Sequence, residues 1–265
     1  MGFAAWMLLA GTGVGLLSGA LGLGGGILML PVFLALVPGI DAHTAKGTSL
    51  TIVVFVALCN AWRLERRESN IPWRLTFLLA SASIGGSFFG AWVTTKMPEN
   101  FVLLIFMSVL LYLGIQTFML KPVRVHESEV RRASGVSIVI GLIAGVVGGA
   151  TGTGGGIVMV PLALKAGIAS NLRVVGLSNM VMVPTAAAGA LAHLLAKQSY
   201  AYPWTAGQIY LPLVPLVFLG AQLASPLGIM VNARLSLHKR RVLLGSLLVM
   251  IAIQILVRLV SSLGK

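Results

Sequence analysis

The stretch GTGVGLLSGALGLGGGILMLP, residues Gly11 to Pro31, decides the fold of this chain. It returns 130 residues later as GLIAGVVGGATGTGGGIVMVP, residues Gly141 to Pro161, with 11 of the 21 positions identical. A match this dense at one fixed offset indicates an internal duplication. The sequence therefore predicts two copies of one unit.

Each copy carries three consecutive glycines inside an apolar segment, at Gly24–Gly26 and at Gly154–Gly156. Glycine is unfavourable in a helix interior, so we expect the helix to break there and to free backbone polar groups. In hydrocarbon those groups must be satisfied or must line a cavity. A break repeated in both halves points to a binding site near the middle of the membrane, between the two copies.

The composition excludes a water-soluble globule. The chain is 57% hydrophobic and 9% charged, whereas about a quarter of the residues of an ordinary soluble domain are charged. Several uncharged runs reach the length of roughly 20 residues that one crossing needs. The sequence thus predicts an all-α polytopic membrane protein. The net charge is +13, and the Lys and Arg residues that produce it lie mostly in short turns between apolar runs. This distribution is typical of cytoplasmic loops and not of a nucleic-acid-binding surface.

The chain divides into a first membrane repeat over 1–120, a cytoplasmic linker over 121–132 and a second membrane repeat over 133–265. Each repeat begins with its glycine-broken segment, at 3–37 and 134–164. The helices expected after those segments span residues 45–64, 73–95, 100–120, 173–196, 205–230 and 239–260.

Basic residues predict that the second repeat is inverted relative to the first. The loop 63–74 holds four arginines while its counterpart 197–204 holds one lysine; the turn 94–100 holds one lysine while its counterpart 232–241 holds four basic residues. Under the positive-inside rule this exchange places equivalent loops on opposite sides. Inversion needs an odd number of membrane crossings per unit. Five crossings satisfy this condition, and so do three crossings plus a re-entrant hairpin; both alternatives stay open.

The acidic residues all fall in predicted loops or at the ends of predicted segments. Their absence from the middle of the membrane argues against a cationic substrate held by a carboxylate and against a carboxylate proton relay. The six acids are Asp41, Glu65, Glu68, Glu99, Glu127 and Glu129.

The predicted site offers hydrogen-bond donors instead. Helices that start after the glycines expose backbone N–H groups and positive dipole ends, which favour an anion. Hydroxyl and amide side chains lie at matching points of both units. In the alternative interpretation, the glycines permit close helix packing and the hydroxyls bond their own helices. The candidate binding residues are Gly24, Gly25, Gly26, Thr48, Ser49, Thr153, Gly154, Gly155, Gly156, Ser178 and Asn179.

Lys46 and Arg173 precede those polar positions, and we expect them at the entrance, where either could attract an anion or serve as an interfacial anchor. The glycine runs are not followed by the Lys-Ser/Thr of a nucleotide loop. No metal-ligand cluster and no nucleophile–base set is visible in the sequence. We therefore expect neither enzymatic activity nor a cofactor.

The chain resembles the sulfite exporter TauE/SafE family. The resemblance rests on GALGLGGGILMLP at 19–31 with AKGTSL at 45–50, and on GGATGTGGGIVMVP at 148–161 with VGLSNM at 175–180. The second copy departs from the pattern of the first, because it has Ser178 and Asn179 in place of Thr and Ser.

The resemblance implies a multi-pass carrier in a bacterial inner membrane, with small sulfur-containing anions as substrates, usually moved outward. Sulfite, sulfonates such as sulfoacetate, and related organic anions all fit this class. The partners are then the anion and the lipid bilayer, with no nucleic acid; the oligomeric state, a homodimer included, stays open. An anion channel and a non-transporting membrane scaffold remain the competing functions.

Overall fold

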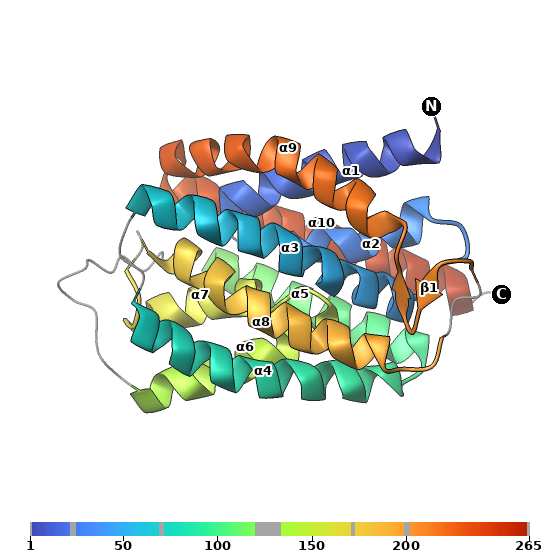
Figure 1. Ribbon diagram of the computed structural model, residues 1–265, viewed down its shortest axis with the longest axis horizontal. Helices are drawn as coiled ribbons and strands as arrows, with labels where there is room; N and C mark the ends of the chain where they lie inside the picture. Colours follow the sequence, from blue (N-terminus) through green and yellow to red (C-terminus); the bar gives the residue numbers. More distant parts are fainter. Residues whose placement is uncertain are drawn as a thin grey trace.

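The computed structural model describes residues 2–21, 25–68, 72–119, 134–170, 173–198 and 202–263. Within these ranges the chain forms ten helices and one pair of two-residue strands (Figure 1). The first half contains α1 (Phe3–Leu21), α2 (Gly26–Leu36), α3 (Ala42–Glu68), α4 (Trp73–Thr95) and α5 (Glu99–Met119). The second contains α6 (Ser134–Thr151), α7 (Gly156–Lys165), α8 (Val174–Leu194), β1 (Thr205–Ala206), β2 (Ile209–Tyr210), α9 (Leu213–Arg234) and α10 (Leu237–Leu263).

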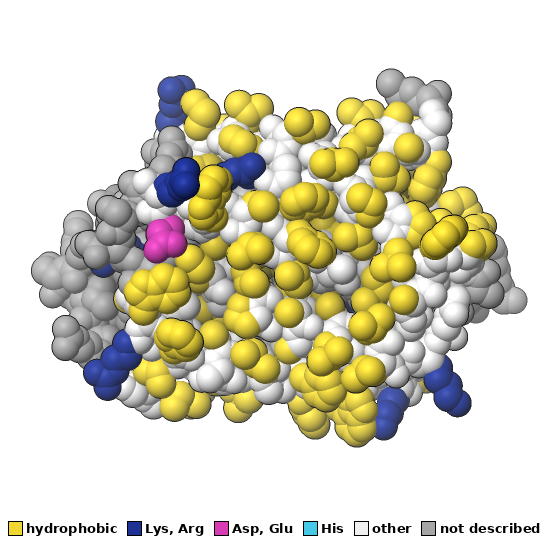
Figure 2. All heavy atoms as spheres, viewed as in Figure 1, with side chains coloured by type: hydrophobic (Ala, Val, Ile, Leu, Met, Phe, Trp, Pro, Cys, Tyr) yellow, Lys and Arg dark blue, Asp and Glu magenta, His cyan; other side chains and the backbone are white. Residues whose placement is uncertain are grey.

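Eight of the described helices are long and apolar enough to cross a membrane, and α2 and α7 are shorter apolar helices. Figure 2 shows apolar side chains over the middle of one face and basic side chains at its two ends. This distribution suits a bundle that spans a bilayer, with its charges at the two interfaces. The predicted class, a polytopic helical membrane protein, is confirmed.

The glycine-broken segments form pairs of one long and one short helix. The 11 residues of α2 extend about 16 Å at 1.5 Å per residue, about half of a hydrocarbon core of roughly 30 Å. In Figure 1, α2 runs back toward the end of the bundle at which α1 begins. Ten full crossings are therefore excluded for the described residues, and α1–α2 and α6–α7 have the form of hairpins.

The two halves exchange packing partners. Helix α1 packs on α9. Helix α6, which contains the second copy of the duplicated glycine stretch, packs on α4. Helix α3 packs on α8, and α5 packs on α10. The two halves are thus interleaved and bury one common apolar core.

Glycines repeated at intervals of four residues make these contacts close. A Cβ atom on Gly15 of α1 would lie 2.1 Å from the carbonyl oxygen of Ala221 on α9. Likewise, a Cβ atom on Gly145 of α6 would lie 2.4 Å from the carbonyl oxygen of Ser83 on α4. Small residues allow helix backbones to approach in this way inside a membrane. The repeated glycines therefore hold the halves together as well as breaking their helices.

One predicted boundary is wrong. The expected helix over 205–230 begins only at Leu213, because residues Thr205–Ala206 and Ile209–Tyr210 pair as an antiparallel hairpin. Gly207 supplies the left-handed backbone of its turn, with φ of 56°, a conformation that glycine adopts without steric cost.

Candidate functional site

The predicted helix breaks are present in both halves. Gly25 and Gly155 precede α2 and α7 with φ of 75° and 86°, in the left-handed region. Glycine adopts this conformation readily because it has no Cβ atom. Gly24 lies outside the described residues.

The end of α6 is closed by a glycine cap. Gly152 has φ of 77°, and the N–H of Thr153 donates to the carbonyl of Gly148 at 3.0 Å. This six-residue bond is the Schellman arrangement, which satisfies carbonyls left over at a helix end. The backbone then turns through Gly154 and Gly155 into α7.

The two breaks meet in the interior of the protein. A Cβ atom on Gly26 would lie 2.8 Å from the Cα and 2.9 Å from the carbonyl oxygen of Thr153. Thr153 is 1% exposed. The meeting point therefore lies between the two halves, where the duplicated sequence predicts the site.

Ser49 of α3 joins the two breaks. Its Oγ lies 2.9 Å from the carbonyl oxygen of Gly152 and 3.4 Å from that of Gly26. The side chain is fully buried. Its one proton is thus directed at backbone carbonyls, which leaves the hydroxyl oxygen as an acceptor.

Thr48 faces a different neighbour. Its Oγ1 donates to the carbonyl of Thr44 at 2.7 Å and accepts the N–H of Tyr210, on β2, at 2.9 Å. The hydroxyl therefore fastens the β hairpin to α3. Both of its hydrogen bonds in this state run to the protein backbone.

Ser178 of α8 lies beside the second break, and Asn179 follows it on the same helix. A Cβ atom on Gly156 would lie 3.0 Å from Ser178 Oγ, and that oxygen is 3.7 Å from Met182 Sδ. Asn179 Nδ2 donates to the carbonyl of Val175 at 2.9 Å. The Oδ1 of Asn179 is buried without a hydrogen-bond partner among the described residues.

Two further contacts complete the second break. Thr153 Oγ1 lies 2.9 Å from Thr151 Oγ1, and Thr151 donates to the carbonyl of Val147. A Cβ atom on Gly154 would lie 2.8 Å from Cγ1 of Val53 on α3. The second break is thus packed directly against the first half.

Lys46 lies elsewhere than predicted. It is 0% exposed, so it is inside the bundle and not at an entrance. Its Nζ donates to Thr94 Oγ1 at 2.7 Å and to the carbonyl of Ala150 at 3.0 Å. These two partners lie at the end of α4 and at the end of α6, so the ammonium is held between two other helices.

Arg173 is only partly buried and lies immediately before α8, with its N–H 3.3 Å from Ser170 Oγ. It thus occupies the start of a helix, as predicted. Its role toward a substrate stays a prediction.

Thr94, the carbonyl of Ala150 and Gly152 are contacts of the site that sequence reasoning missed. Gly152 belongs to the identical positions of the duplication, which was a usable signal. Nothing in the sequence around Thr94 marks it as a partner of Lys46, because the two residues lie on different helices.

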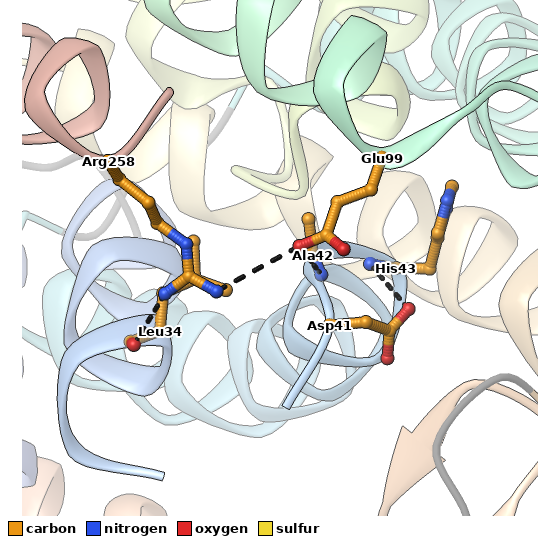
Figure 3. A network of polar contacts seen from close by, with 6 residues as sticks. All are labelled: Leu34, Asp41, Ala42, His43, Glu99 and Arg258. Carbon is orange, nitrogen blue, oxygen red and sulfur yellow. Dashed lines mark hydrogen bonds and ion pairs between the residues drawn. The ribbon is translucent and has the colours of Figure 1, made fainter. Parts of the chain in front are cut away.

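A second polar cluster closes the end of the bundle at which α3 begins (Figure 3). Glu99 Oε1 accepts the N–H of Ala42 at 3.0 Å, and Arg258 Nη2 lies 3.9 Å from the same oxygen. Arg258 Nη1 donates to the carbonyl of Leu34 at 2.6 Å. This cluster ties α10 and α5 to the end of α2 and the start of α3.

Among the described residues, no group of three or more His, Cys, Asp or Glu side chains is placed to hold a metal ion. The polar contacts at the meeting point come from hydroxyl, amide, ammonium and backbone groups. The arrangement is suited to hydrogen bonding of a small polar ligand.

Comparisons with known proteins place the chain among membrane transporter proteins. The family model described as sulfite exporter TauE/SafE matches residues 7–255. A probable membrane transporter protein of Methanocaldococcus jannaschii is 25% identical over 249 residues, covering 91% of each chain. One from Haemophilus influenzae is 26% identical over 263 residues, covering 95% of this chain and 97% of that one.

A third relative, the probable membrane transporter protein YdhB of Bacillus subtilis, is 29% identical over 194 residues, which cover 68% of this chain and 75% of that one. No solved structure matches the chain significantly. The family model covers nearly the whole length, including both glycine breaks and the helices that meet them. This protein therefore belongs to the sulfite exporter TauE/SafE family.

Proposed function

We propose that this protein carries sulfite or organosulfonates such as sulfoacetate across the membrane, in the direction of export. The site lies where the breaks before α2 and α7 meet, between the two halves. The observation that carries the proposal is the contact between Gly26 and Thr153, enclosed by buried donors from α3 and α8.

The chemistry of the enclosing groups supports an anion. Lys46 and Asn179 supply ammonium and amide protons, and both are at most 1% exposed. Each hydrogen bond to a charged group is worth roughly 1.5–3 kcal/mol, so a few of them, offset by desolvation, suit micromolar to millimolar binding of about 4–8 kcal/mol.

Burial of these groups supports alternating access over an open channel. Ser49 and Thr153 are shielded from solvent on all sides in this state. A substrate could reach them only if the halves moved. The paired short helices α2 and α7 are the natural moving parts, because each is joined to its long helix through left-handed glycines.

We further propose that the two repeats, 1–120 and 133–265, have inverted topology in the membrane. The exchange of packing partners, α1 on α9 and α6 on α4, supports a twofold relation between them. In Figure 1, α1 begins at one end of the bundle and α6 at the other. The basic loops then assign the end that carries Arg63–Arg74 and Arg234–Arg241 to the cytoplasm of a bacterial inner membrane.

Reconstitution tests the proposal. Proteoliposomes should take up labelled sulfite and sulfoacetate in a saturable way, and comparison with and without an imposed pH gradient should identify the coupling. Ohmic current that does not saturate would favour an anion channel. Absence of any flux, with the protein folded, would contradict transport of these anions and favour other small organic anions or a scaffold.

A further inference from the structure

Lys46 is a buried cation whose hydrogen bonds go only to neutral oxygens. Its side chain is 0% exposed, and its two hydrogen bonds reach the hydroxyl of Thr94 and the carbonyl of Ala150. Among the described residues, no carboxylate forms an ion pair with it. A buried charge is costly unless a counter-charge and hydrogen bonds compensate it.

The ammonium retains one donor. Lysine has three N–H donors, and two are occupied. The hydroxyl of Thr94 donates its own proton to carbonyls of α4, since Oγ1 lies 3.1 Å from Gly90 O and 3.0 Å from Ala91 O. Toward Lys46 it is therefore an acceptor. The third proton of Lys46 has no acceptor among the described residues.

Lys46 lies directly at the meeting point of the breaks. A Cβ atom on Gly152 would lie 3.0 Å from both Cβ and Cγ of Lys46. Ser49, three residues further along α3 and hence on the same face, binds the carbonyl of Gly152. Both side chains thus reach from the first half to the break of the second.

We propose that Lys46 supplies the fixed positive charge of the transport site and binds an oxygen of the sulfite or sulfonate group. The inference rests on the proposed function and identifies the residue that recognises the charge of the substrate. A sulfonate oxygen accepts the third ammonium proton, while Thr94 and the carbonyl of Ala150 hold the other two. The bound anion then compensates the charge of Lys46.

Other titratable groups surround this cation without bonding to it. Asp41 and His43 lie at the start of the same helix, and His193 of α8 is bound at Nδ1 to Gln208, 2.8 Å away. Gly47, the residue after Lys46, packs against the Cβ of His193. The alternative role for Lys46 is structural, as a cap on the final carbonyls of α6.

Calorimetry on the purified full-length protein in lipid nanodiscs separates these roles. Lys46→Gln should weaken sulfoacetate binding about 10- to 100-fold, the effect of one charge-assisted hydrogen bond. Lys46→Arg should retain most of the affinity. The matched control is Lys96→Gln, which removes an exposed lysine from the same region, where it stacks over the Trp92 ring at 3.6 Å, and should bind as the wild type does.

Equal affinity in the wild type and in Lys46→Gln would overturn the inference and leave the proposed function intact. Failure of the folded wild type to bind either sulfite or sulfoacetate would contradict the proposed function itself. If Lys46→Gln does not fold, the wild type labelled with 15N-lysine answers the same question. The nitrogen resonance of Lys46 Nζ is assigned as the one missing from the spectrum of Lys46→Arg. Its chemical shift should change on titration with sulfoacetate, and an unchanged shift would overturn the inference.

Discussion

Gly26 and Thr153 touch through their backbones, although they come from different halves of the chain. A Cβ atom on Gly26 would lie 2.8 Å from Thr153 Cα, closer than real Cβ contacts allow. Backbone atoms on both sides leave little room for adjustment, so the contact is specific for glycine.

Replacing Gly26 by Leu should therefore abolish uptake of labelled sulfite by proteoliposomes while membrane expression remains measurable. Gly155→Leu should do the same, because it also forces a side chain into a left-handed backbone with φ of 86°. Gly85→Ala is the control, since nothing lies within 4 Å of a Cβ atom at that helical position. Full flux in Gly26→Leu would show that the meeting of the breaks is irrelevant to transport.

Thr48 should hold the β hairpin in place. Thr48→Val removes the side-chain acceptor of the Tyr210 N–H, at a cost of about 0.5–1.5 kcal/mol for one hydrogen bond of a partly buried donor. Hydrogen exchange at Tyr210 should accelerate accordingly. Thr51→Val, which removes a hydroxyl that bonds the carbonyl of Gly47 within α3, is the comparison. Similar exchange at Tyr210 in both variants would rule out this role.

The orientation of the repeats can be read by labelling. In a background with Cys59 replaced by Ser, single cysteines near Arg66 and Arg240 should react only from the cytoplasmic side. Cysteines near Lys96 and Lys197 should react from the periplasmic side. If positions near Lys96 and Arg240 were labelled from the same side, the repeats would not be inverted.

Arg258 should stabilise the end of α2. Its side chain and that of Glu99 are each 38% exposed, so their ion pair alone adds little. The hydrogen bond to the carbonyl of Leu34 makes the larger contribution, and Arg258→Ala should cost about 1 kcal/mol. The midpoint of thermal unfolding in detergent measures this loss.

Glu99 provides the companion test of that cluster. Glu99→Gln keeps an acceptor for the N–H of Ala42 and should lower the unfolding midpoint less than Glu99→Ala does. A loss from Glu99→Gln as large as that from Arg258→Ala, which removes the ion pair and the hydrogen bond to Leu34 together, would mean that the ion pair, and not the hydrogen bonds, holds the cluster together.

The sequence by itself determined where the helices lie and where they break. Helix α4 spans Trp73–Thr95, the predicted range, because hydropathy and helix boundaries are local properties of the chain. The breaks before Gly26 and Gly156 were predictable for the same reason, since a glycine needs no distant partner to adopt a left-handed backbone. The hairpin at 205–210 was not, because its residues belong to the same uncharged run as the helix that follows.

Only the tertiary structure decided which side chains enclose the meeting point. The sequence predicts Lys46 as a charge at the entrance. In the structure it is buried, and its hydrogen-bond partners Thr94 and Ala150 lie 48 and 104 residues away along the chain. Ser49 reads as a donor for a ligand, yet it binds the carbonyl of Gly152, 103 residues away. Burial and hydrogen bonding of these groups depend on how α3, α4 and α6 pack, and that packing joins segments which carry no local signal of one another.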